Sequence, residues 1–471
     1  MFEKDDVLSR VLNPDTSDMP RAYRLANHSR IHSWEDYSKQ MDDEYRQCEG
    51  EGLDIEALKP AFEAIRQMEP GAFRALAADR LFELIGQCKT RADFNYEEPS
   101  DLEGILAARP AHDKRLRKAD ASRLPAQLRG AWYGRIAGCL LGKTVEGIRT
   151  EELLPFLRDS GNLPMHRYIV SGDVPQDAPS RYRFDFQHRC YADKLSFAPA
   201  DDDTNYTCLY QQLIEKYGRD FTSNDVCAIW QNRQPKTAYC TAERVAYMNM
   251  NRGLTPPHTA TYENAYREWI GAQIRGDYFG YINPGDPKTA AEMAWRDACV
   301  SHVKNGIYGE MFIAAMLAWA AVESDLMEII RAGLDEIPKN CRLQKEVEQL
   351  LEKYRAGESE EKAFSWIHAL YDEHTGYGWC HTNPNALIVC ASMLWTGGDF
   401  GRAICRAVQT GFDTDCNGAT VGSILGLRGG IACIEQRWLA PLGGQLNTNI
   451  IGVGCASIDE LVSTTLKHIG A

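Results

Sequence analysis

The chain has 471 residues with an apolar fraction of 44% and a charged fraction of 25%, which is typical of a globular protein with a substantial core. Acidic residues outnumber basic residues by 66 to 52, which argues against a general affinity for nucleic acid. The first residues, MFEKDDVLSR, lack the pattern of a signal peptide, and the longest apolar run, 311–322, is too short to span a bilayer. We therefore expect a cytoplasmic protein with no membrane partner and no nucleic-acid partner.

Helical patterns dominate the first part of the chain. Apolar residues recur at spacings of three and four over 55–68 and 71–88, and turn-like sequence separates these patterns from their neighbours. No group of residues there has catalytic spacing. We predict an N-terminal helical extension over 1–125 and a functional domain over 126–471.

A ladder of glycines opens the second domain. Gly130, Gly134, Gly138 and Gly142 follow one another every four residues, and Glu146 is the next member of the series. On an α-helix this spacing forms one stripe, along which another backbone can approach closely. Glycine costs roughly 1 kcal/mol relative to alanine inside a helix, so the ladder implies a compensating packing or functional gain. Glu146 either ends this packed face or lies on the surface.

A run of three carboxylates lies near the end of a long segment rich in proline, aspartate and aromatic residues. This segment, 163–205, shows no sustained period and is expected to be irregular. Asp201, Asp202 and Asp203 stand directly before a helical pattern. Adjacent carboxylates repel one another unless cations or helix N-terminal amides neutralise them. The alternative is one helix cap with two solvated neighbours.

Further helical patterns, separated by polar loops, follow along the chain. Convincing alternating strands are scarce, which makes all-α the predicted fold class. Helical patterns cover 287–304, 309–332, 342–355, 361–371, 385–396, 399–410, 418–427 and 458–469.

The stretch GFDTDCNGAT carries a second acidic motif. Asp413 and Asp415 precede Gly418, Gly422 and Gly426, which form another four-residue series. Two glycine-striped helices with acids at one end could converge with the aspartate triplet into an oxygen-lined pocket suited to magnesium, calcium or manganese. Two such ions about 3.5–4 Å apart could orient a substrate diol and a water molecule.

These motifs resemble the landmarks of the ADP-ribosylglycohydrolase family. GAWYGRIAGCLLGKTVEG, DDDT and DTDCNGATVGSILG occur in the family's order, and the resemblance covers about 126–450. It implies an orthogonal multi-helix all-α bundle with a centre of two Mg²⁺ ions, for which Mn²⁺ is an alternative. It also implies hydrolysis at the anomeric carbon of an ADP-ribosyl or related ribosyl conjugate, either a small molecule or linked to protein.

The resemblance also implies site residues, with some departures from the family pattern. Asp201 replaces the usual Thr or Ser, Cys416 replaces a Thr, and Cys139 replaces an Asp, so the number of metal ions is in question. The candidate catalytic residues are Glu146, Asp202 and Asp413. The candidate metal ligands are Asp201, Asp202, Asp203, Asp413, Asp415 and Cys416.

Five further residues are candidates for substrate binding. Arg275 and His302 mark the ends of a stretch that resembles the family's Arg-to-His segment. Tyr308 follows in SHVKNGIYGEMF, and His381 and Asn385 lie in GWCHTNPNA. Two alternative functions stay open at this point. One is a glycosidase for a small nucleoside-like metabolite, and the other is a non-enzymatic, crystallin-like structural or binding protein.

Overall fold

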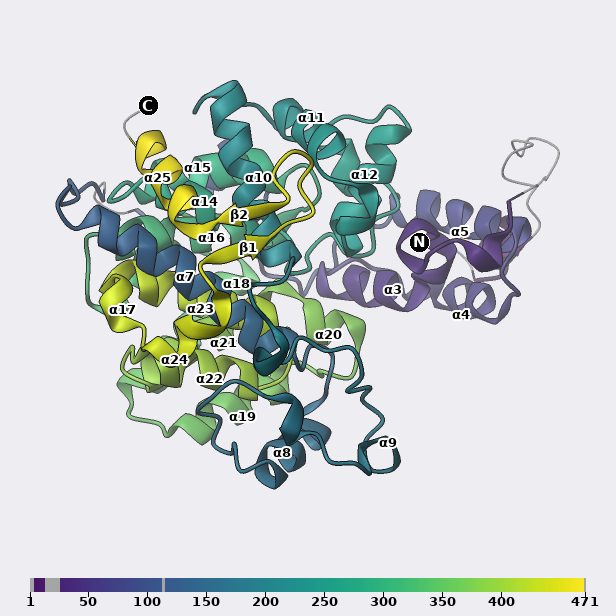
Figure 1. The fold of residues 1–471 in the computed structure, drawn as a ribbon. Helices are drawn as coiled ribbons and strands as arrows, with labels where there is room; N and C mark the ends of the chain where they lie inside the picture. The colour runs from purple at the N-terminus through teal and green to yellow at the C-terminus, as the bar shows by residue number, and fades with distance from the viewer. Residues whose placement is uncertain (1–3, 13–25, 112–114, 470–471) are drawn as a thin grey trace.

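The computed structural model describes residues 4–12, 26–111 and 115–469, and its regular structure is almost entirely helical (Figure 1). The all-α prediction is therefore confirmed. No helix in these three ranges combines the length and the apolarity needed to cross a bilayer.

The first helices form a group with its own apolar core, drawn in purple in Figure 1. They are α1 (Lys4–Leu12), α3 (Met41–Gly50), α4 (Lys59–Gln67) and α5 (Ala72–Ile85). Ala61, Phe62 and Ile65 are buried on one face of α4, as the apolar spacing predicts. Leu81 on α5 and Val7 on α1 complete the same core.

Two buried helices, α7 (Leu124–Lys143) and α23 (Thr414–Gly429), run antiparallel through the larger part of the molecule (Figure 1). Their glycine ladders face each other, with Gly138 against Gly418. A Cβ atom at either position would overlap the carbonyl oxygen of the facing glycine, so no other residue fits without a backbone shift. The antiparallel direction brings the start of α23, with its acidic motif, against Gly142.

The remaining helices surround this pair, and a single small sheet of two antiparallel strands is present among the described residues. The strands are β1 (Gln445–Asn447) and β2 (Cys455–Ser457). The helices are α6 (Leu102–Ala108), α8 (Thr150–Asp159), α9 (Ala178–Arg181), α10 (Asp202–Tyr217), α11 (Ser223–Arg233), α12 (Thr241–Asn251), α13 (His258–Thr261), α14 (Asp277–Tyr281), α15 (Pro287–Ala298), α16 (Lys304–Ala320), α17 (Leu326–Leu334), α18 (Arg342–Arg355), α19 (Glu360–Leu370), α20 (Gly376–Cys380), α21 (Thr382–Trp395), α22 (Phe400–Gln409), α24 (Gln436–Leu439) and α25 (Ile458–Ile469).

One predicted helix is two helices in the structure. The pattern over 309–332 contains α16 and α17, which are separated by a short turn. Asp325 starts the second helix, because its side chain accepts a hydrogen bond from the Glu328 amide at 3.1 Å. Apolar periodicity continues on both sides of the turn and does not reveal this break.

The segment predicted to be irregular over 163–205 is irregular over 163–201, with α9 as the only α-helix of that range, whereas 202–205 form the first turn of α10, which Asp201 caps. The segment packs over the second half of α7, where the Tyr168 hydroxyl donates to the Ala137 carbonyl at 3.1 Å. Tyr182, Phe186 and Tyr191 are buried in the same core. These contacts hold the segment beside the end of α7.

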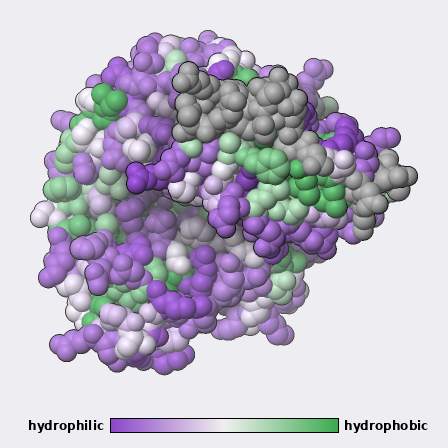
Figure 2. Space-filling view, turned by 90° about the vertical axis from the view of Figure 1, so that its right-hand side faces the viewer, coloured by the Kyte–Doolittle hydropathy of each residue, from purple (hydrophilic) through white to green (hydrophobic). Residues whose placement is uncertain are grey.

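The surface is mostly hydrophilic on the face that Figure 2 shows. Hydrophobic residues occupy smaller areas of this face. All fifteen cysteines are free thiols, and most of them are buried.

Candidate metal centre

Three segments converge at one end of the α7 and α23 pair. The end of α7 lies against the start of α23, and α10 begins beside them. Asp201 caps α10, because its Oδ1 atom accepts a hydrogen bond from the Asp203 amide at 2.9 Å. Helix N-termini favour negative charge through their unpaired amides and the helix dipole. The fold therefore gathers acidic motifs that lie far apart in the sequence.

The convergence creates two groups of possible ligand atoms that share one aspartate. Asp203, Asp415 and Cys416 offer atoms within 4.8 Å of one another. Cys139, Asp201 and Asp203 form the second group, also within 4.8 Å. All five residues are buried, so the side chains face one another and not bulk water.

Asp202 and Asp413 lie beside these two groups without belonging to either. The charges of Asp201, Glu146 and Asp413 act on Asp202, so all these acids share one electrostatic environment. Burial is the main cause that raises the pKa values of Asp202 and Asp413. Both predicted residues are thus placed at the rim of the centre.

Unpartnered oxygens are the strongest sign of a ligand. Asp203 Oδ2 and Asp415 Oδ1 are buried and have no hydrogen-bond partner. Burial, with repulsion from neighbouring acids, raises the pKa values of both residues well above the ordinary range. A divalent cation would satisfy these oxygens and keep the acids ionised. The carboxylates fit Mg²⁺ or Mn²⁺, whereas the thiols of Cys139 and Cys416 suit Mg²⁺ poorly.

Two basic residues of α7 that the sequence analysis did not select also face the acids. Arg135 Nη2 lies 3.1 Å from Asp203 Oδ1, and Nη1 lies 2.9 Å from Asp277 Oδ2, with all three side chains fully buried. Lys143 Nζ forms an ion pair with Asp201. Their positions could have been found from the sequence, since Arg135, Cys139 and Lys143 each directly follow a glycine of the ladder and so recur with the same four-residue period.

Glu146 lies in a turn after α7, not on a continuation of that helix. The helix ends because the chain turns over Thr144–Gly147, where Gly147 has a φ of +89°. Glu146 is half-buried. Burial, followed by the charges of Asp413 and Asp201, raises its pKa to about 7. A carboxyl group with this pKa can take up or release a proton near neutral pH.

Asn385 supports the acidic loop of α23. Its side-chain oxygen lies 3.3 Å from the Asp413 amide and 2.8 Å from Asn417 Nδ2, from which it accepts hydrogen bonds. Its side-chain nitrogen donates to the carbonyls of Trp379 and His381 at 3.0 and 2.9 Å. All of these contacts are internal, so Asn385 is placed as a positioning residue.

Arg275 and His302 lie outside the acidic centre. Arg275 is fully buried and bonds to Asp297 Oδ2 at 2.7 Å and to Glu243 Oε1 at 2.6 Å. His302 contacts Ser301 Oγ at 2.8 Å and lines a mostly apolar cavity of about 640 Å³. None of the candidate metal ligands lines this cavity. The structure therefore does not bring Arg275 and His302 together with the aspartates.

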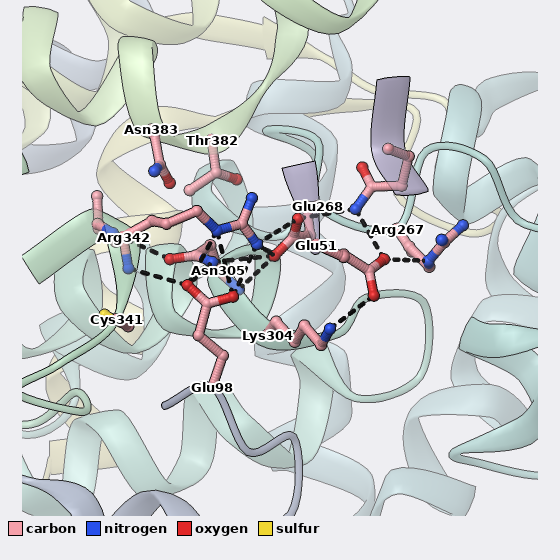
Figure 3. A network of polar contacts seen from close by, with 12 residues as sticks. Glu51, Glu98, Arg267, Glu268, Lys304, Asn305, Cys341, Arg342, Thr382 and Asn383 are labelled. Atoms are coloured by element: carbon pink, nitrogen blue, oxygen red, sulfur yellow. Dashed lines mark hydrogen bonds and ion pairs between the residues drawn. The ribbon is translucent and has the colours of Figure 1, made fainter. Parts of the chain in front are cut away.

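A second polar network, shown in Figure 3, joins the N-terminal helices to the larger part of the molecule through Glu51 of the loop after α3, Glu268 and Arg342. Tyr308 and His381 lie beside this network. Glu268 lies at its centre, bonded by Arg342 Nη2 at 2.6 Å and by Gln47 Nε2 of α3 at 2.7 Å. His381 Nε2 is 3.6 Å from Glu268, and the Tyr308 hydroxyl donates to the carbonyl of Pro99. These contacts place both predicted residues in an interface between parts of the chain.

Replacing Arg342 with methionine should lower the free energy of unfolding by about 3 kcal/mol or more. The change leaves the carboxylates of Glu268 and Glu98, with side chains 0% and 2% exposed, without their cation. Denaturant titration measures the loss. Arg437→Met is the matched control, since its pair with Glu435 is about half exposed and should contribute at most about 1 kcal/mol. Equal losses in the two variants would contradict the structural role of the network.

Comparisons with known proteins identify the family of this chain. The model of the ADP-ribosylglycohydrolase family matches residues 120–467, which contain both glycine ladders and both acidic motifs. A solved structure described as an ADP-ribosylglycohydrolase-related protein complex is 18% identical, with a TM-score of 0.45, over 74% of this chain and 99% of that chain. No curated protein matches the sequence.

Proposed function

This chain belongs to the ADP-ribosylglycohydrolase family, and we propose that it is a magnesium-dependent hydrolase of an ADP-ribosyl or related ribosyl conjugate, cleaving the glycosidic bond at the anomeric carbon. One observation carries the proposal. Asp203 and Asp415, from separate motifs, meet in a buried group in which each keeps an oxygen without a partner. Such oxygens require a cation or protons.

In this proposal Asp202, Asp203, Asp413 and Asp415 hold the metal, with Asp201 and Cys416 next to them. A bound divalent cation supplies Lewis-acid polarisation and orients the ribose hydroxyls and water. Asn385 keeps the loop that carries Asp413 in place through the backbone amide.

Glu146 supplies the proton transfer in the proposed reaction. It is half-buried, and its pKa of about 7 leaves both the acid and the carboxylate populated near neutral pH. As the glycosidic bond breaks and positive charge develops at the anomeric carbon, the carboxylate stabilises that charge and accepts a proton from the attacking water, and this proton then passes to the leaving group. The free protein would favour this base form above pH 7.

The substrate is proposed to enter beside Glu146. Arg189 of the irregular segment lies there, with Nη1 donating to the Glu146 carbonyl at 3.4 Å. A diphosphate group could bind this guanidinium. Arg189 is, however, already stacked on Phe184 at 4.3 Å and bonded to the Asp185 carbonyl. Because these contacts occupy the guanidinium, a nucleoside-like substrate without a diphosphate is the second candidate.

Turnover assays with ADP-ribosyl-arginine, ADP-ribosyl-serine and a panel of nucleosides separate the two candidates. No turnover of any of these compounds would support the non-enzymatic alternative.

Replacing Cys416 with threonine should preserve or strengthen Mg²⁺ binding. A hydroxyl oxygen is a harder donor than a thiol, and it would lie in the same group as Asp203 and Asp415. Calorimetric titration with MgCl₂ measures the affinity. Cys390→Ser, at a buried thiol on α21 outside this group, controls for the loss of a thiol in the core. A marked fall in affinity for Cys416→Thr alone would mean that the thiol itself is required.

A further inference from the structure

A lysine ammonium lies inside the candidate metal centre. Lys143 is the last residue of α7, and its Nζ atom forms an ion pair with Asp201. The side chain of Asp201 is 1% exposed, and that of Lys143 is 23% exposed. The other charged or ionisable side chains that act on the ammonium are Asp415, Cys139 and Glu146. The cation therefore faces the same acids that a metal would bind.

The two groups of ligand atoms differ in which carboxylate oxygens remain without a partner beside this ammonium. Both oxygens of Asp201 are occupied, Oδ1 by the Asp203 amide and Oδ2 by Lys143. The group of Cys139, Asp201 and Asp203 thus already holds a cation. In the other group, Asp415 Oδ1 is buried without a partner, and so is the Oδ2 atom of the shared Asp203.

Like charges also disfavour a second ion in the first group. A divalent cation bound at Asp201 would displace the ammonium or lie against it in a buried site, where repulsion is weakly screened. Each group also contains one thiol, Cys139 or Cys416, so the thiols do not distinguish the two groups. In the second group Arg135 is bound to Oδ1 of the shared Asp203, but Asp203 Oδ2 and Asp415 Oδ1 have no partner.

We infer that the Lys143 ammonium takes the place of one divalent cation, so that this chain binds a single divalent ion, at the group of Asp203, Asp415 and Cys416 with Asp202 and Asp413 beside it. This inference rests on the proposed metal centre and specifies how many ions it holds. It also gives Lys143 a role as a built-in cation that neutralises Asp201.

The test counts the ions in the whole protein. Chelator-stripped protein is dialysed to equilibrium against Mn²⁺, the bound metal is measured by elemental analysis, and electron paramagnetic resonance reports coupling between neighbouring Mn²⁺ ions. The wild type should bind one ion per chain with no coupling. Lys143→Met should bind two coupled ions, because it keeps the aliphatic chain and frees Asp201. Lys143→Arg keeps the positive charge and should bind one.

Controls distinguish a failure of this inference from a failure of the proposed metal centre. Lys288→Met, at a partly exposed lysine on α15, should bind one uncoupled ion like the wild type. Lys143→Gln is measured beside Lys143→Met in case the apolar methionine disturbs folding. The number of ions bound by the wild type tests the inference independently of either variant. Two ions in the wild type, or one in both neutral Lys143 variants, would overturn the inference and leave the metal centre standing. No bound ion in any protein would overturn both.

Discussion

Asp415→Asn is expected to remove divalent-metal binding, and with it turnover, while the helical fold persists. Asp415 Oδ1 is buried without a partner in the group that contains Asp203 and Cys416. An amide of the same shape lacks the negative charge, so Mg²⁺ affinity should fall by at least ~100-fold. This loss is at the upper end of, or greater than, the loss usual for replacing a residue that only hydrogen-bonds to a metal ligand. Because burial and nearby acids raise the pKa of Asp415, the neutral amide should leave the metal-free protein equally or more stable.

Calorimetric titration with Mg²⁺ and thermal unfolding with and without the metal measure both parts of this prediction. Asp413→Asn should behave in the same way. Asp459→Asn, at an exposed pair with Arg129, is the control and should bind Mg²⁺ like the wild type. Full activity in both Asp413→Asn and Asp415→Asn would rule out the proposed centre.

Gly138→Ala is expected to lower the free energy of unfolding by about 2–3 kcal/mol, the upper part of the usual cost of overpacking. The new Cβ atom would overlap the Gly418 carbonyl, and backbone cannot move aside as a flexible side chain can. The sign of the change in the free energy of unfolding is informative, because Gly→Ala in a solvent-exposed helix stabilises a protein by roughly 1 kcal/mol. The effect should extend to metal binding, because α7 and α23 carry parts of the centre at their adjoining ends.

Denaturant unfolding followed by circular dichroism gives the change in free energy. Gly172→Ala is the matched control, since a Cβ atom there meets nothing within 4 Å, and its stability should stay close to that of the wild type. A Gly138→Ala variant as stable as the wild type would contradict the close contact of the two helices.

The sequence allowed much of the architecture to be predicted. The four-residue glycine spacing identified the close-packed faces of α7 and α23, and the scarcity of alternating patterns indicated an all-α fold. Periodicity identifies a face but not its partner, so the pairing of Gly138 with Gly418 required the structure. The turn between α16 and α17 was missed because capping by Asp325 leaves the apolar period almost unchanged.

The site could be predicted only in part. Carboxylates such as Asp203 and Asp415 are visible as motifs, and the structure places them together. Lys143 shares the four-residue period of the glycine ladder, but the period does not say which acid its ammonium meets; that partner, Asp201, lies on another segment. Tyr308 and His381 lie near polar motifs in the sequence, but His381 contacts Glu268 and the Tyr308 hydroxyl donates to the Pro99 carbonyl, contacts that only tertiary packing defines.

The most direct test of the central claim is calorimetric titration of the chelator-stripped wild-type protein with Mg²⁺ and Mn²⁺, followed by turnover assays in the same preparation. Saturable binding, together with metal-dependent turnover of an ADP-ribosyl or nucleoside substrate, is the predicted result. Absence of binding by either ion would contradict a metal centre built on Asp203 and Asp415.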